Sequence, residues 1–243
     1  LTVIAITGTN GKTTVSHFVS QLLNALHKKT AVIGTVGFFI NGEKQQTAYE
    51  QLTTLQAKEL HPILKQCVRK GVTHVVLEAS SMGLQQHRLD HCDIDCGVFL
   101  NLSDDHLEDH GGLEAYKRAK KRLADLSKKL VLNGDDNFCR SVGIYDKKKS
   151  CSFGFDNHND LHIQIVSESA GKTVLCLQTT ASEHIVEIPF VGKYHVQNTI
   201  AALMAVWRIG VPMEDIVEHM WSLKLPEGRL EKIDNPLGIE VYV

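Results

Sequence analysis

The stretch AITGTNGKTT, residues 5–14, decides the class of fold. An apolar β-branched run, residues 2–6, precedes its glycines, and a pattern of helical spacing follows from Lys12. Strand, glycine loop and helix in this order form a phosphate cradle, because loop N–H groups and the helix dipole attract anions. Ile6 replaces the first glycine of the usual G-x-x-x-x-G-K-[ST] pattern. We therefore interpret Ile6 as the last buried residue of the strand and Gly8 as the first glycine of a shorter loop.

The residue types of this loop predict a nucleoside triphosphate site. Gly8 and Gly11 permit close approach of the backbone, Lys12 would reach the outer phosphates, and Thr13 would offer its hydroxyl to Mg²⁺. No asparagine in the chain is followed by lysine, so the Asn-Lys-x-Asp motif by which GTPases read the base is absent from the sequence. The sequence also shows no clear basic lid of the kind that P-loop kinases use.

The amino-acid composition limits the kinds of partner that the protein is expected to bind. Of 243 residues, 43% are hydrophobic and 22% are charged, which is ordinary for a soluble globular protein. A net charge of −2 gives no sequence-wide basic field for nucleic acid or an anionic membrane. The six cysteines form no CxxC pair, which favours buried reduced thiols over a metal beside His91 or a disulfide scaffold. No run reaches the roughly 18 apolar residues of a membrane span. We expect a cytoplasmic protein without nucleic acid or membrane partners.

The alternation of strands and helices predicts an α/β fold. Apolar β-branched runs alternate with helical patterns up to about residue 150, which indicates a P-loop, doubly wound, mainly parallel sheet flanked by helices on both faces. Asn41-Gly42 predicts a hairpin turn. Short strands with polar turns predict a small antiparallel β layer around residues 151–190, and residues 194–209 and 213–223 return to helix. The sequence starts and stops within apparent strands, so we expect a piece of a longer protein.

Two polar groups follow strands of the predicted sheet. Glu78 ends the strand 72–77, and because ligands of doubly wound sheets lie beyond the carboxyl ends of strands, it could hold Mg²⁺ near Thr13. A helix-capping or turn acid is the alternative. The loop that follows contains Arg88, which suits an anionic substrate. His106 follows another strand and could bind a metal, although a structural histidine is about equally supported by the residues alone.

Taken together, these stretches resemble the Mur ligase family, the ATP-dependent amide-forming ligases of peptidoglycan precursor synthesis. Nine matching stretches run in family order across nearly the whole chain: TGTNGKTT (7–14), GTVG (34–37), LTT (52–54), EASSMGLQQHR (78–88), NLSDDHLEDH (101–110), YKRAKKRL (116–123), LNGDD (132–136), GKYHVQNTIAA (192–202) and EGRLE (227–231). The fourth most resembles the MurE subgroup, which adds the third amino acid to UDP-N-acetylmuramoyl-L-alanyl-D-glutamate.

The resemblance implies a domain organisation. Mur ligases have a UDP-sugar-binding domain, a central ATPase domain and an amino-acid-binding domain. Residues 1–243 then represent the central ATP-binding domain, with a small β subdomain at about 151–190, and the N-terminal UDP-binding and C-terminal amino-acid domains are absent from this sequence. The implied partners are a UDP-N-acetylmuramoyl-peptide and an amino acid, and the implied cofactors are ATP and Mg²⁺.

The resemblance also implies roles for the matching residues. Lys12, Glu78, His106 and Lys120 take the catalytic positions. ATP binding falls to Gly8, Thr9, Asn10, Gly11, Lys12, Thr13, Thr14, Asn198 and Arg229. Mg²⁺ binding falls to Thr13, Glu78, His106 and Lys120. Lys120 matches a lysine that CO₂ carbamylates, which turns a cation into an anionic oxygen ligand; spacing alone would make it an ordinary surface lysine. Substrate binding falls to Thr53, Thr54, Ser80, Gln86 and Arg88.

The sequence departs from the family pattern at three positions. Leu55 replaces the proline that usually follows LTT, His195 replaces an asparagine, and Met82 stands where the MurE subgroup often has histidine. Two alternatives therefore stay open. One is a paralogue acting on another acidic substrate, of the folylpolyglutamate or cyanophycin type. The other is a nucleotide-binding switch module.

Overall fold

A single large sheet organises the chain. The computed structural model describes residues 1–49, 51–103, 111–144, 148–169, 171–228, 232–233 and 241–242. Eleven strands of this described part form one sheet in the order β11-β10-β9-β8-β7-β6-β1-β5-β2-β3-β4. Their bounds are β1 Thr2–Thr7, β2 Thr30–Gly34, β3 Gly37–Ile40, β4 Glu43–Lys44, β5 His74–Glu78, β6 Ile94–Phe99, β7 Ser127–Asn133, β8 Ser150–Gly154, β9 Leu161–Ser169, β10 Lys172–Gln178 and β11 Glu183–Ile188. A separate pair joins β12 Lys232–Ile233 to β13 Val241–Tyr242.

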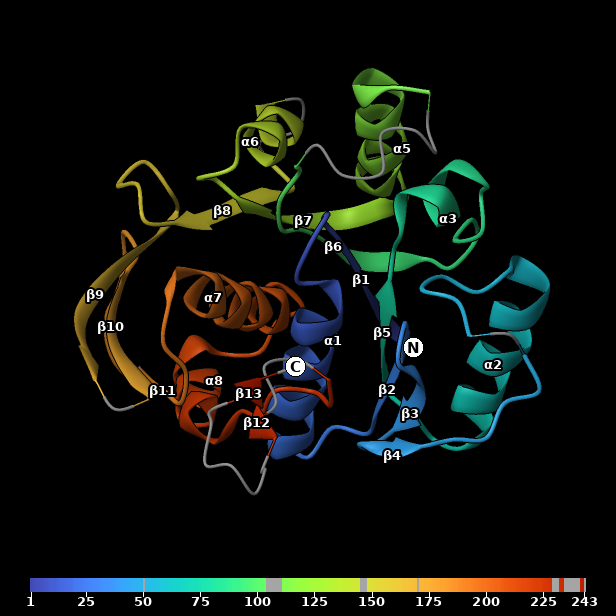
Figure 1. Cartoon of the computed structure of the whole chain (residues 1–243), viewed down its shortest axis with the longest axis horizontal. Coiled ribbons are helices and arrows are strands. Elements are labelled where there is room, and N and C mark those ends of the chain that lie inside the picture. The colour runs from blue at the N-terminus through green and yellow to red at the C-terminus, as the bar shows by residue number, and fades with distance from the viewer. Residues whose placement is uncertain are drawn as a thin grey trace.

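Helices cover both faces of the sheet. The described helices are α1 Lys12–Ala25, α2 Ala57–Arg69, α3 Ser81–Gln85, α5 Leu113–Leu126, α6 Asn137–Ile144, α7 Lys193–Arg208, α8 Met213–Val217 and the 3₁₀ helix η1 Met220–Ser222. Figure 1 shows α1, α7 and α8 on the inner side of the curved sheet and α3, α5 and α6 on the opposite side. The strand β1 feeds both layers, because Ile4 and Ile6 join one buried cluster while Val3 and Ala5 join the other.

The centre of the sheet is parallel, as the sequence predicts. The strand β1 pairs in parallel with β5 and β6, and the parallel pairing continues to β2 on one side and to β9 on the other. Consequently the carboxyl ends of β1, β5 and β6 meet at one edge of the sheet. This edge carries the phosphate loop, Glu78 and the segment that begins at Leu100.

Three local expectations can be compared with the structure. The Asn41-Gly42 turn is confirmed, with both residues at positive φ (51° and 83°) between β3 and β4. The antiparallel layer is present as β9, β10 and β11, but β8 is a parallel strand that joins it to the main sheet. The helix expected over residues 213–223 is shorter: α8 ends at Val217, and a 3₁₀ turn follows.

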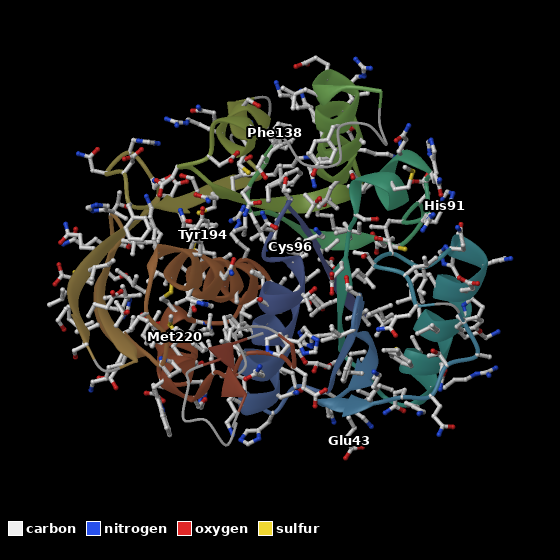
Figure 2. All side chains as sticks on the ribbon, in the orientation of Figure 1. Glu43, His91, Cys96, Phe138, Tyr194 and Met220 are labelled. Carbon is white, nitrogen blue, oxygen red and sulfur yellow. The ribbon has the colours of Figure 1, made fainter. Side chains whose placement is uncertain are left out.

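The cysteines belong to the packed interior. All six are free thiols and all are buried, which agrees with the reduced thiols expected from their spacing. Cys96 lies near the centre of the molecule, whereas Glu43 and His91 lie at its periphery (Figure 2). Within the described part of the chain, no helix combines the length and the apolar character needed to cross a membrane.

Candidate active site

The phosphate loop joins the end of β1 to the start of α1. Gly11 caps the helix at φ 89°, a left-handed conformation that favours glycine. A Cβ on Gly11 would lie 2.5 Å from the side-chain oxygen of Asn198, so this position needs glycine for space as well. Asn198 comes from α7, which means that the predicted ATP-contacting asparagine lies against the loop. The geometry brings two distant predicted residues together.

The segment after β6 braces the loop from the other side. Asn101 accepts a hydrogen bond from the Asn10 amide (2.9 Å) and donates to the Asn10 carbonyl (3.2 Å). Its backbone carbonyl also accepts from the Thr9 amide at 3.0 Å. The Lys12 ammonium donates to the carbonyl oxygens of Gly8 (2.9 Å) and Thr9 (3.0 Å). The loop is therefore held in shape by its own chain and by the neighbouring strand end.

Glu78 is a buried carboxylate at the end of β5, only 1% exposed. It accepts hydrogen bonds from the Thr13 hydroxyl (3.1 Å) and from the amide (3.0 Å) and hydroxyl (2.9 Å) of Thr35. Burial raises its pKa, and the hydrogen bonds from Thr35 and Thr13 oppose that rise. A Cβ on Gly34 would overlap the carboxylate, so Gly34 makes the cradle in which Glu78 lies.

The chemistry of this pair fits a magnesium ion. Glu78 offers carboxylate oxygens and Thr13 a hydroxyl oxygen, and Mg²⁺ prefers oxygen ligands with several waters retained. Among the described residues, no cluster of three or more His, Cys, Asp or Glu side chains could hold a metal without outside ligands.

The five predicted substrate residues form one connected network beside Glu78. The Thr54 hydroxyl donates to the Glu78 carbonyl (2.7 Å) and accepts from the Ser80 amide (2.9 Å). Arg88 donates to the Thr54 carbonyl (2.6 Å) and to the side chain of Gln86 (2.9 Å). Thr53 extends the network on the other side, since its hydroxyl lies 3.0 Å from that of Thr35, a partner of Glu78. The structure therefore links all five, directly or through one another, to Glu78 or its partner Thr35.

Lys120 is buried, contrary to what spacing alone would indicate. Its side chain is 1% exposed, and its ammonium lies 4.6 Å from the centre of the Tyr116 ring. Burial, aided by the positive charge of Lys12, lowers the pKa of Lys120 from 10.5 to about 7. A large fraction of this lysine is therefore a neutral amine near neutral pH, and a neutral amine is a nucleophile.

Comparison with known proteins agrees with this geometry. The family profile described as the Mur ligase middle domain matches residues 6–206. The chain belongs to the Mur ligase family.

Individual relatives are similar over the whole of this Mur ligase domain. It is 36% identical to the UDP-N-acetylmuramoyl-L-alanyl-D-glutamate--L-lysine ligase of Staphylococcus haemolyticus and 33% identical to UDP-N-acetylmuramoyl-L-alanyl-D-glutamate--2,6-diaminopimelate ligase 2 of Clostridium acetobutylicum. Each alignment covers 100% of the chain and 50% of the relative, so the chain spans about half the length of these curated relatives. A solved structure of a UDP-N-acetylmuramoyl-L-alanyl-D-glutamate--2,6-diaminopimelate ligase superposes with a TM-score of 0.85 at 35% identity, over 97% of this chain and 49% of that one.

Two predicted site residues of the Mur ligase domain lie outside the described part. These are His106, a predicted magnesium ligand, and Arg229, a predicted ATP contact. Of the other predicted ATP-binding residues, Thr14 is buried in the first turn of α1. The remaining ones belong to the loop or, like Asn198, lie against it.

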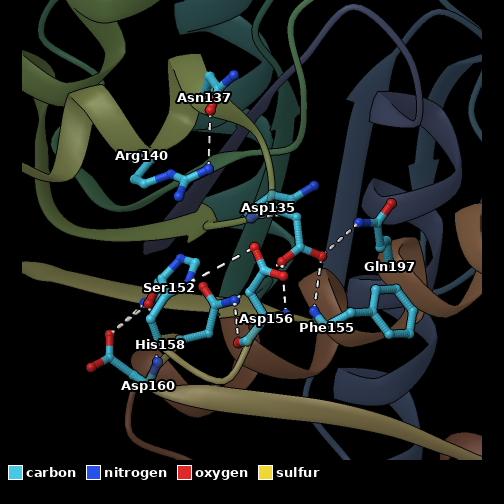
Figure 3. Close-up of polar contacts among 11 residues, drawn as sticks. Asp135, Asn137, Arg140, Ser152, Phe155, Asp156, His158, Asp160 and Gln197 are labelled. Atoms are coloured by element: carbon cyan, nitrogen blue, oxygen red, sulfur yellow. Dashed lines mark hydrogen bonds and ion pairs between the residues drawn. The ribbon is translucent and has the colours of Figure 1, made fainter.

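Sequence reasoning missed the structural role of the acidic pair in the LNGDD stretch. Asp135 accepts hydrogen bonds from the amides of Phe155 (2.8 Å) and Asp156 (3.1 Å), which fixes the turn after β8. It also accepts from Gln197 (3.3 Å), the neighbour of Asn198 on α7 (Figure 3). Asp135 thereby ties the β8 turn to the start of the helix that reaches the phosphate loop. An acid just beyond a strand end was the available signal.

Proposed function

We propose that the chain is the ATP-binding domain of an ATP-dependent acid–amino-acid ligase. The parent enzyme would add an amino acid to a UDP-N-acetylmuramoyl-dipeptide during peptidoglycan precursor synthesis, in the cytoplasm. The observation that carries the proposal is the 3.1 Å contact between Thr13 of the phosphate loop and Glu78. The substrate network joins the same residue through the Glu78 carbonyl. UDP-sugar-binding and amino-acid-binding domains elsewhere in the parent protein would complete the site.

The loop and the strand-end acid would bind ATP and its magnesium. The loop amides and Lys12 would bind the phosphates, and Thr13, Glu78 and His106 would hold Mg²⁺. The ion would supply positive charge to neutralise the phosphate oxygens as they react. Asn198 and Arg229 would contact ATP from their own segments. The loop geometry and the oxygen atoms of the Thr13–Glu78 pair support this assignment of phosphate and Mg²⁺ binding.

The reaction we propose proceeds through an acyl phosphate. A carboxylate oxygen of the dipeptide attacks the γ-phosphorus of ATP, the bond to the β–γ bridging oxygen breaks, and ADP leaves. The incoming amine then attacks the acyl carbon, a tetrahedral intermediate forms, and inorganic phosphate leaves as the amine nitrogen loses a proton. Such a sequence depends on positioning and on charge neutralisation by Lys12, and it needs no enzymatic nucleophile. Thr53, Thr54, Ser80, Gln86 and Arg88 would orient the dipeptide.

Lys120 would act as a carbamate. The neutral amine attacks the carbon of CO₂, one C–O π pair moves to oxygen, and the nitrogen gives its proton to water. The product carries a negative charge and oxygen donors, and so can serve as a ligand for a second Mg²⁺. The lowered pKa of Lys120 supports this role, because only the neutral amine reacts.

Substrate-dependent phosphate release by the complete ligase tests the proposal. We expect multiple-turnover release of inorganic phosphate from ATP to require both a UDP-N-acetylmuramoyl-dipeptide and an amino acid. Cleavage that proceeds equally without either substrate would refute a ligase and favour a nucleotide switch. Cleavage that instead depends on a folylpolyglutamate or a cyanophycin-type acceptor would support the proposed ligase reaction but refute the proposed substrate.

A further inference from the structure

Tyr116 lies between two parts of the candidate site that are far apart in the sequence. It belongs to α5, one helical turn before Lys120, and its side chain is 1% exposed. Residues four apart share a helix face, which is why the ammonium of Lys120 can lie over the Tyr116 ring, 4.6 Å from its centre. The hydroxyl at the other end of the same ring lies 3.1 Å from the Thr9 hydroxyl of the phosphate loop.

The contact with Thr9 bears on the shape of the loop. The Thr9 hydroxyl also accepts a hydrogen bond from the Ser103 amide at 3.0 Å. The Thr9 hydroxyl is therefore held by two partners, one from the segment after β6 and one from α5. Loss of either partner would leave a largely buried polar group less well satisfied and would free the loop to adopt other conformations.

The contact with Lys120 bears on how the unmodified side chain of that lysine is held. The π face of an aromatic ring attracts a cation and gives no such attraction to an anion. The nitrogen of Lys120 lies close enough to the Tyr116 ring to be held in place by this contact. A carbamate on the same nitrogen would lose this attraction.

We propose that Tyr116 is a positioning residue that couples the phosphate loop to Lys120, holding Thr9 through its hydroxyl and the unmodified lysine through its ring. The half that concerns Thr9 rests on the proposed function of the loop. The half that concerns Lys120 stands on the ring contact alone.

Two substitutions test the Thr9 contact and the Lys120 contact separately without creating a cavity in the core. Tyr116→Phe removes the hydroxyl and keeps the ring. A 3,4,5-trifluorophenylalanine at position 116 keeps the ring's size and weakens its attraction for a cation. The same fluorinated residue at Phe138 is the matched control, because the contact that the described residues give this ring is with Phe99.

The first measurement is the affinity for a fluorescent ATP analogue with Mg²⁺. Tyr116→Phe should weaken binding about three- to tenfold, the effect of one lost buried hydrogen bond. Unchanged affinity would overturn the Thr9 half of the inference. If the unsubstituted chain binds no nucleotide at all, the proposed function fails instead, and the second measurement still decides the Lys120 half.

The second measurement is the rate at which cyanate labels Lys120, followed by mass spectrometry with exposed Lys58 as internal reference. Relative to Tyr116→Phe, the fluorinated ring at position 116 should speed labelling about two- to fivefold, because the ammonium loses its attraction to the ring. Tyr116→Phe itself should label like the unsubstituted chain. An equal rate with both rings, or an equal increase in the Phe138 control, would overturn the Lys120 half.

Discussion

Replacing Lys120 with methionine should stabilise the domain while removing the proposed carbamate. The lysine is fully buried, and burial together with the charge of Lys12 lowers its pKa from 10.5 to about 7. A buried ammonium therefore lowers the free energy of unfolding whenever that lysine is protonated in the folded chain. Methionine has a similar length and no charge, so Lys120→Met keeps most of the packing and removes this cost.

The size of the effect follows from the pKa and depends on pH. At about 1.36 kcal/mol per pKa unit, the gap between 10.5 and about 7 sets an upper bound near 5 kcal/mol. Local rearrangement and water entry on protonation reduce such costs, so we expect about 2–3 kcal/mol. Below about pH 7 both the folded and the unfolded chain carry the proton, and the full cost applies. Between about pH 7 and 10.5 only the unfolded chain carries it, so the stability of the lysine form rises with pH and the advantage of methionine shrinks.

Urea denaturation from pH 6 to 9.5 measures this difference. The buffers must be free of CO₂ and bicarbonate, because a carbamate would remove the cation. Lys58→Met on the exposed face of α2 is the control, and it should change stability by less than about 0.5 kcal/mol at any of these pH values. The reasoning would be refuted if Lys120→Met were less stable than the lysine form at pH 6. It would also be refuted if the difference between the two stayed constant up to pH 9.5.

Three further substitutions test the site and its surroundings. Gly11→Ala puts a Cβ 2.5 Å from the Asn198 oxygen on a residue at φ 89°. In thermal melting the stability should fall by about 1–3 kcal/mol, and in calorimetric titration the nucleotide affinity should fall at least about tenfold. Unchanged affinity would contradict the loop geometry. Glu78→Gln should abolish magnesium-dependent nucleotide binding. The melting temperature should stay the same or rise, because burial makes the charge of the Glu78 carboxylate unfavourable. Unaltered Mg²⁺ dependence would exclude Glu78 as a ligand. Arg122→Ala breaks the 2.7 Å ion pair with partly exposed Asp90 and should cost less than about 1 kcal/mol in urea; a loss above about 2 kcal/mol would show a larger structural role.

The parts of the site that lie at strand ends could be predicted from the sequence. Gly8, Lys12 and Glu78 follow from local patterns, because apolar runs locate the strands and parallel strands bring their carboxyl ends together. The 3.1 Å contact between Thr13 and Glu78, 65 residues apart, is a direct consequence of that topology. The parallel pairing of the central strands likewise follows from the alternation of strands and helices.

The parts that depend on helix packing could not be predicted from local patterns. Lys120 lies in a strongly basic stretch that is typical of a solvated helix face, and only the family resemblance singled it out. Its burial arises because α5 turns the face that carries Tyr116, Ala119 and Leu123 toward the sheet. Lys120 shares the helical spacing of that face, but its charge and its basic neighbours favoured a solvated interpretation. Tyr116 was missed for the same reason, whereas Thr35, in the turn after β2, was missed because its partner Glu78 lies on another strand. Thr35 contacts Glu78 of β5, and Tyr116 contacts Thr9 of the phosphate loop as well as Lys120 of its own helix.

Glu78 and Lys120 place the same kind of demand on the fold. Burial raises the pKa of the carboxyl and lowers that of the amine, so each shift favours the neutral form. Substitutions that neutralise either group should therefore stabilise the domain while removing a proposed ligand, which is the usual conflict between stability and function. The two groups differ in what offsets their cost. A nearby divalent cation would favour the charge of Glu78, whereas it would oppose an ammonium at Lys120 and favour a carbamate there. If both are ligands, magnesium should therefore promote carbamylation of Lys120, and that dependence should be lost in Glu78→Gln.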